Sequence, residues 1–253
     1  MGSGGSSTPR SLKSPPAQPQ VVMDVSQAIS ANNDVFSDTD SADFHNLYNG
    51  RNYFLSQTFN IDTQMAIMDY LSDAPIPGSM YSASQDLNYA MESGQELNAN
   101  QQFMVDSLND GMHNLGYNVN LTRYGRTGYL DSFGKLFKNG VNSSNYENMT
   151  DAQLKKAFVG KTYTEDKFVS TSYNDFKNAP SSNAFTDKAV RFNIKAPAKT
   201  QALMPGNGPG GSLGEIVLKP GQTFKITGVR FTGKQGRTGF NYSKQIEFDV
   251  EIL

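Results

Sequence analysis

The chain contains no cysteine and no tryptophan, and its only histidines are His45 and His113. Without cysteine there are no disulfides, thiolate metal sites or cysteine nucleophiles, although this does not fix the cellular compartment. Two histidines are too few for most histidine-based metal centres, so we expect no metal site. No apolar run approaches the roughly 18 residues of a membrane span, and the N-terminus lacks the apolar core of a secretory signal. We therefore expect no association with a membrane.

An excess of charge of one sign is also missing. The 253 residues include 22 Lys and Arg and 24 Asp and Glu, which gives a formal net charge of -2. Such a balance provides no global field that would attract nucleic acid or an anionic membrane. The length suits one domain with a tail, or two small domains, and is sufficient for a substantial core.

Residues 1–44 are rich in Ser, Pro, Gly, Asn, Asp and Gln, and Pro15, Pro16 and Pro19 interrupt any helix. This composition predicts a disordered linker or a tag-like tail. Two alternatives remain open within it: the first 20 residues are either native or an expression remnant, and residues 21–29 form either plain linker or a short docking helix. We assign the folded domain to residues 45–253.

Apolar residues at helical spacing predict three helices at the start of this domain, over residues 60–71, 84–94 and 98–115. Prolines at 75 and 77 end the first helix, and Gly94 closes the second. We expect the following apolar side chains to face the core as ordinary filler: Ile61, Met65, Met68, Leu71, Leu87, Ala90, Met91, Phe103, Leu108, Met112 and Leu115.

After Gly116 the apolar period shifts to two, which indicates strands. We expect strands near residues 119–124, 167–173, 188–196, 200–204, 214–219, 222–232 and 243–253. The last strand alternates apolar and acidic residues, which predicts one buried and one wet face. Residues 125–160 are expected to be mostly irregular, with one short helix at 150–158 whose capping box pairs Thr150 with Gln153. Helices followed by strands indicate an α+β domain.

Three short motifs stand on these predicted strands. Arg123 lies in Leu121–Tyr124, the Ser-Thr-Ser run Ser170–Ser172 follows Phe168 and Val169, and Glu215 follows a glycine-rich loop at 205–214. Downstream of Glu215 comes the run Ile-Val-Leu-Lys-Pro-Gly-Gln-Thr-Phe. Each motif alone is typical of an exposed strand or loop end, but a loop held by a rigid scaffold is also where function concentrates.

Taken together and in this order, the motifs resemble the Arg-Ser-Glu class of mono-ADP-ribosyltransferases, the ADP-ribosyltransferase exoenzyme family. It includes clostridial Rho-modifying exoenzymes, binary actin-modifying toxins and many phage-encoded members. The resemblance covers roughly residues 50–253. It implies an α+β fold in which two small, mainly antiparallel β-sheets form an NAD cleft, with the N-terminal helices packed on one side.

The resemblance also implies the chemistry. The family cleaves the nicotinamide–ribose bond of NAD, and positive charge builds on the ribose as in glycoside hydrolysis. Glu215 would be the catalytic carboxylate at the ribose 2′-hydroxyl, Ser170 would orient it, and Arg123 would bind the phosphates. The cofactor-binding set implied in this way is Arg123, Tyr124 (through its backbone, to the nicotinamide amide), Ser170, Thr171, Ser172, Phe185 (stacked on nicotinamide) and Glu215.

One position departs from the family. Most members carry Glu or Gln two residues before the catalytic Glu, where this chain has Leu213. Leucine cannot accept a proton or orient an acceptor. Three readings stay open. The chain is a protein ADP-ribosyltransferase whose acceptor is activated by another residue or is already nucleophilic, an NAD glycohydrolase that uses water, or a catalytically silent phage virion or interaction module.

We expect an unidentified protein acceptor. Nucleic acid is disfavoured, because the chain has neither tryptophan nor a basic stripe. Without a visible signal peptide, we expect action in the cytoplasm of a host bacterium or carriage in a phage virion, with toxin secretion as the alternative.

Overall fold

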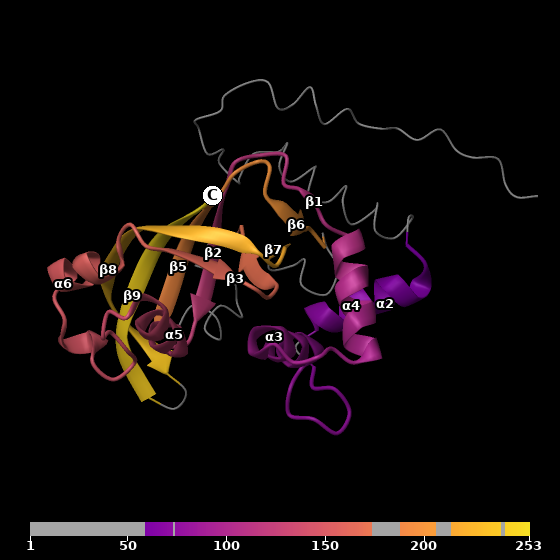
Figure 1. Ribbon diagram of the computed structural model, residues 1–253, viewed down its shortest axis with the longest axis horizontal. Helices are drawn as coiled ribbons and strands as arrows, with labels where there is room; N and C mark the ends of the chain where they lie inside the picture. Colours follow the sequence, from indigo (N-terminus) through magenta and orange to yellow (C-terminus); the bar gives the residue numbers. More distant parts are fainter. Residues whose placement is uncertain (1–58, 73, 174–187, 206–213, 239–240) are drawn as a thin grey trace, which may run out of the picture.

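The computed structural model describes residues 59–72, 74–173, 188–205, 214–238 and 241–253 (Figure 1). The helices are α2 (Ile61–Leu71), α3 (Ala83–Ser93), α4 (Ala99–Asp110), α5 (Gly128–Phe137), α6 (Asp151–Phe158) and the 3₁₀ turn η2 (Tyr146–Asn148). The strands are β1 (His113–Asn114), β2 (Val119–Gly125), β3 (Thr162–Glu165), β4 (Val169–Ser172), β5 (Val190–Ala196), β6 (Gln201–Leu203), β7 (Glu215–Leu218), β8 (Gln222–Thr238) and β9 (Asn241–Ile252). In these ranges no helix is long and apolar enough to cross a membrane.

The three predicted N-terminal helices are confirmed, and side-chain caps fix where they begin. Asn60, Ser82 and Asn98 each accept a hydrogen bond from a backbone N–H of the first turn, which satisfies donors that a helix leaves unpaired. The third helix is shorter than predicted. It ends at Asp110, and the chain then enters β1.

The predicted inner face of α2 is wrong. Ile61, Met65 and Met68 are 66%, 54% and 48% exposed, whereas Thr63, Ala66, Ile67 and Tyr70 are buried. Both sets recur at helical spacing, so the apolar pattern alone could not decide between them. Tyr70 and Ile67 supply the bulk, and two small residues let α2 lie close to its neighbours.

Of the other residues predicted to lie in the core, some are buried and some are not. Leu87, Ala90, Leu108, Met112 and Leu115 are buried as expected, although the last two lie beyond the end of α4. Phe103 is 46% exposed, against the prediction, while Leu71 and Met91 pack at the margin of the core.

The nine strands form one continuous sheet in the order β1-β6-β7-β4-β2-β5-β9-β8-β3. Only β5 and β9 run parallel; the other neighbours are antiparallel. Strands β2 and β4 are joined through a single residue pair, Thr122 with Ser172. The two expected sheets are thus the two arms of one sheet, β1-β6-β7-β4 and β2-β5-β9-β8-β3, hinged at this pair.

A separate group of helices packs on each arm of the sheet. Helices α2, α3 and α4 pack on the β7 side and enclose a small core that includes Ile67, Tyr70 and Val217, and they form a layer apart from α5 and α6 (Figure 1). A larger core lies under α5 and α6. There, Phe133 of α5 contacts Phe192 of β5 and Phe248 of β9 edge-on.

Four elements were not predicted: α5, β3, the 3₁₀ turn η2 and the two-residue β1. Helix α5 was not predicted because it contains Gly128 and Gly134, and glycine has a low helix propensity. Gly134 is required by packing, because a Cβ there would lie 2.1 Å from the carbonyl oxygen of Val141. The capping box of α6 between Thr150 and Gln153 is confirmed.

The last strand corrects one further expectation. Its apolar residues are buried as predicted, but Glu247 on the other face is only 6% exposed rather than wet. Its carboxylate pairs with Arg191 of β5 at 3.0 Å and also with Arg230 of β8. The acidic face of β9 is therefore partly sealed by cations from both neighbouring strands.

Candidate active site

The predicted catalytic carboxylate lies where the two arms of the sheet meet. Glu215 opens β7 directly opposite Ser172 of β4, and Ser172 is opposite Thr122 of β2. Residues opposite one another on neighbouring strands project from the same face. The side chains of Glu215, Ser172 and Thr122 therefore form one row across three strands, with Ser170 on the same face one step along β4.

A buried tyrosine from the helical layer reaches this face. Tyr70 of α2 is 2% exposed, and its hydroxyl accepts a hydrogen bond from Asn88 Nδ2 at 3.1 Å and bonds the side chain of Ser170. Burial raises the pKa of Tyr70 to about 12; the bonds to Asn88 and Ser170 and the charge of Arg123 oppose this rise, and the charge of Glu215 adds to it. At neutral pH the hydroxyl is thus a neutral link between helix and Ser170.

The guanidinium of Arg123 is fixed by two hydrogen bonds. Nη1 donates to the backbone oxygen of Ser170 at 2.9 Å, and Nη2 donates to the hydroxyl of Tyr129. The guanidinium carbon also lies 5.5 Å from the centre of the Tyr129 ring. This ring fits because residue 125 is glycine, where a Cβ would approach it to 2.7 Å. Arg123 and Ser170 are thereby held as a unit.

A second carboxylate stands near Arg123. Burial raises the pKa of Glu165 on β3, against the opposing charges of Arg123 and Lys167. Conversely, burial lowers the pKa of Arg123, but Tyr129 and Glu165 outweigh it, so the pKa of this guanidinium is raised. Lys167 Nζ lies 2.6 Å from Glu92 Oε2 of α3 and 3.9 Å from Glu165 Oε2. Arg123 therefore stays charged within a chain of alternating charges.

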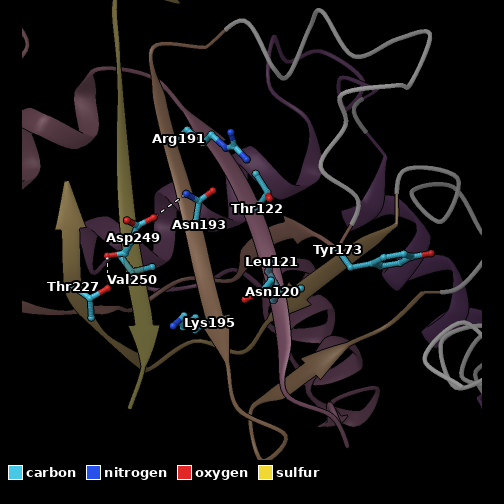
Figure 2. A pocket seen from close by; sticks show the side chains of 10 residues that line it. All are labelled: Asn120, Leu121, Thr122, Tyr173, Arg191, Asn193, Lys195, Thr227, Asp249 and Val250. Carbon is cyan, nitrogen blue, oxygen red and sulfur yellow. Dashed lines mark hydrogen bonds between the residues drawn. The ribbon is translucent and has the colours of Figure 1, made fainter. Parts of the chain in front are cut away.

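A pocket of about 500 Å³ is lined by side chains of β2, β5 and β9 (Figure 2). Through Thr122 it continues the polar row that begins at Glu215. Its wall includes Thr122 of β2, Asn193 of β5 and Asp249 of β9, which are opposite one another in the sheet. Asn193 Nδ2 donates to Asp249 Oδ1 at 2.9 Å. At a strand spacing of about 4.8 Å, Thr122 lies roughly 10 Å from Glu215.

Further lining residues give the pocket its charge. Arg191 and Lys195 of β5 flank Asn193 along the wall. The ring of Tyr173 lies on the side of β2 that faces away from β5 (Figure 2). Arg123, Ser170 and Glu215 are not among the lining residues, so the pocket adjoins the predicted catalytic group rather than containing it. Thr122, which lines the pocket, and Ser172 are the polar residues of the row between the pocket and Glu215.

The remaining predicted residues have different environments. Tyr124 is half-buried, with its ring 5.7 Å from the guanidinium carbon of Arg191. Thr171 is buried, and its hydroxyl donates to the carbonyl oxygen of Ile216 at 2.7 Å, so this side chain is committed to the strand. Phe185 and Leu213 lie outside the described residues.

Sequence reasoning missed Tyr70, Tyr129 and Glu165. The first was hidden by the wrong face assigned to α2, and the other two lie in elements that were not predicted. A tyrosine at helical spacing with Thr63, Ala66 and Ile67 was the one available signal. Within the described ranges, no group of three or more His, Asp or Glu side chains could hold a metal ion.

The comparison with protein families matches residues 45–245 to the family described as ADP-ribosyltransferase exoenzyme. A comparison with curated proteins gives no match. Among solved structures, the C3 exoenzyme of Clostridium limosum is 16% identical with a TM-score of 0.58, over 87% of this chain and 98% of that one.

Two further structures are similar in the same way. Plx2a, an ADP-ribosyltransferase toxin from Paenibacillus larvae, is 17% identical with a TM-score of 0.56, over 83% of this chain and 95% of that one. C3stau2 from S. aureus, solved with NAD, is 14% identical with a TM-score of 0.53, over 84% and 96%. At such identities these structures establish the shared fold, and the family match covers most of the chain. The chain belongs to the ADP-ribosyltransferase exoenzyme family.

Proposed function

We propose that this protein is a mono-ADP-ribosyltransferase that cleaves the nicotinamide–ribose bond of NAD and transfers ADP-ribose to a protein acceptor. Family membership supports ADP-ribosyl transfer in general, and C3stau2, a relative in fold, was solved with NAD. The observation that carries the proposal is the position of Glu215, opposite Ser172 at the hinge of the two sheet arms and close enough to Tyr70 to affect its pKa.

The reaction requires stabilisation of charge rather than a strong acid. When the bond between the ribose C1′ and the nicotinamide nitrogen breaks, the electron pair leaves with a neutral nicotinamide, and positive charge builds on the ribose. A carboxylate fixed beside the ribose stabilises this charge without reorganising during the reaction. The acceptor then forms a bond to C1′ and loses a proton. In this account Glu215 supplies the carboxylate.

Arg123 is suited to bind the phosphates of NAD. A guanidinium has five N–H donors, and the two described hydrogen bonds to Ser170 and Tyr129 use one each on Nη1 and Nη2. A phosphate brought to the remaining donors would meet a cation whose position is already fixed, so little side-chain entropy is lost on binding. The polar pocket beside Thr122 extends the surface available to the rest of the nucleotide.

The other residues act on these two groups. Ser170, held from behind by the Tyr70 hydroxyl, orients Glu215, and the backbone of Tyr124 meets the nicotinamide amide. Thr171 contributes through the strand, since its hydroxyl is bonded to Ile216. Ser172 lies directly opposite Glu215, and this position supports a contact with the ribose in the proposed complex.

Leu213 supports a second candidate function, an NAD glycohydrolase in which water replaces the protein acceptor. The two are separated by incubating the protein with a bacterial lysate and NAD labelled in its adenylate half, while free nicotinamide is measured in parallel. Label on discrete protein bands supports the transferase, and nicotinamide release with no labelled macromolecule supports the glycohydrolase. Absence of both labelled protein and free nicotinamide contradicts the transferase and the glycohydrolase alike.

A further inference from the structure

The nearly balanced net charge conceals a strong asymmetry along the chain. Residues 52–122, which contain α2, α3 and α4, include eight Asp and Glu and not one Lys or Arg. Residues 123–253 include 19 Lys and Arg and 11 Asp and Glu. In the part of the chain that the structure describes, the helical layer makes one ion pair, from Glu92 to Lys167. The helical layer is therefore acidic, and the rest of the same domain is basic.

The same layer exposes an apolar stripe. Ile61, Met65 and Met68 recur at i, i+4 and i+7, so they share the outer face of α2, and all three are about half exposed or more. Asp62 and Asp69 are exposed beside them. Isolated exposed apolar residues are ordinary, but a contiguous patch rimmed by polar groups marks a contact surface. Methionine suits such a surface because its side chain adapts to different shapes.

The outer face of α2 lies close to the proposed active site. The opposite side of α2 carries Tyr70, whose hydroxyl bonds Ser170, so one helix separates the exposed stripe from the proposed active site. A helix with its side chains is about 10–12 Å across. A protein docked on the outer face of α2 is large enough to extend past this distance and present a side chain to the ribose.

We infer that the outer face of α2 is a docking surface for the protein acceptor, and that the matching surface of this acceptor is basic and carries apolar side chains. The inference rests on the proposed function, because it identifies the partner with the acceptor. Charge complementarity indicates the partner: the described helices α2, α3 and α4 carry carboxylates and no Lys or Arg, so they repel an acidic partner and steer a basic one. The apolar stripe supplies the buried contact at its centre.

Two other occupants fit the charges less well. Residues 1–51 include three Lys and Arg and five Asp and Glu, so this segment is itself weakly acidic. The basic part of a second copy has the right sign, but pairing unlike surfaces of identical chains leads to open assemblies unless a ring closes. Both occupants are outcomes of the tests below.

The first test separates docking from chemistry. The double variant Met65→Lys/Met68→Lys places two cations on the stripe, and Leu136→Lys/Tyr242→Lys adds the same charges at exposed apolar positions of the basic part. With lysate and labelled NAD, we expect the first variant to reduce protein labelling by about tenfold or more, the loss typical of a disrupted interface anchor. Nicotinamide release in water should stay unchanged, and the control should alter neither.

Equal labelling by both double variants would overturn the docking inference while leaving the proposed function intact. Absence of nicotinamide release in the unmodified protein would instead contradict the proposed function. A second measurement then decides the docking inference without any need for activity.

This second measurement uses the lack of cysteine. In a Met65→Cys variant the only thiol is labelled with a polarity-sensitive dye and titrated with an amphipathic Lys/Leu peptide of about 18 residues, five helical turns. We expect a saturable blue shift with this peptide, none with its Glu/Leu counterpart, and about tenfold weaker binding after Asp62→Lys/Asp69→Lys. Binding of both peptides alike, of neither, or without dependence on the aspartates would overturn the inference.

The same variant reports the rival occupants. Slow reaction of the thiol in the native protein, compared with the unfolded chain, would show that a segment of this chain covers the stripe. A molar mass that rises with protein concentration and falls on Met65→Lys would show that a second copy does. Either result would contradict docking of a basic acceptor.

Discussion

Replacing Tyr70 by phenylalanine removes one oxygen from the wall behind Ser170 and leaves the ring in place. The hydroxyl is buried and bonds both Asn88 and Ser170, and Asn88 Oδ1 already has no partner among the described residues. A neutral hydrogen bond contributes about 1 kcal/mol, and a buried group left unsatisfied costs about 1–3 kcal/mol. We therefore expect Tyr70→Phe to lower the free energy of unfolding by about 2 kcal/mol.

For a domain of this size, about 2 kcal/mol corresponds to a fall of roughly 4–8 °C in Tm, measured by circular dichroism. Tyr89→Phe on the neighbouring helix is the matched control, because Tyr89 is 65% exposed and its change should stay within about 0.5 kcal/mol. If Ser170 orients Glu215, nicotinamide release by Tyr70→Phe should also slow roughly fivefold, equivalent to about 1 kcal/mol. Equal Tm values for the two variants would refute the role of the hydroxyl.

Three further predictions concern the core, the charge cluster and the nucleotide. Gly134→Ala should destabilise the fold by more than about 1 kcal/mol, because its Cβ would meet the carbonyl oxygen of Val141, whereas Gly128→Ala in the same helix meets nothing within 4 Å and should be neutral or stabilising; equal urea midpoints would contradict this. Since the pKa of Glu165 is raised in the folded state, the native state binds its proton more tightly, and this stabilisation is lost as pH rises from the ordinary carboxyl pKa through the raised one. The free energy of unfolding of Glu165→Gln, relative to that of the unmodified protein, should therefore increase as pH rises. Parallel pH profiles of the two proteins would contradict the raised pKa of Glu165. Arg123→Ala should weaken NAD binding at least tenfold by calorimetry, and unchanged affinity would exclude the phosphate-binding role.

The sequence predicted the fold wherever local chemistry and tertiary packing agree. The capping box at Thr150 and the three N-terminal helices follow from spacing and caps that act within a few residues. The two arms of the sheet came from the family resemblance, and the structure joins them at the single pair of Thr122 and Ser172. Helix α5 could not be predicted, because Gly134 lowers helix propensity while its lack of a side chain is needed for the close contact with the backbone of Val141, which lies outside the helix.

The candidate site divides in the same way. Arg123, Ser170 and Glu215 were predicted from motif order, and they lie on the neighbouring strands β2, β4 and β7. The residues that contact them were not predicted, because their role depends on how different helices and strands pack together. Tyr70 reaches Ser170 from a helix whose inner face the apolar pattern misassigned, and Tyr129 meets Arg123 from a helix that was not predicted.

In the proposed reaction, the carboxylate of Glu215 acts in the transition state of nicotinamide–ribose cleavage. The most direct test compares Glu215→Gln with the unmodified protein in two assays, NAD affinity by calorimetry and the rate of nicotinamide release. Because the carboxylate mainly stabilises the charge that develops on the ribose, we predict that release falls at least about a hundredfold while affinity stays within several-fold. Retained release, or a loss of affinity that accounts for the whole loss of rate, would contradict the account.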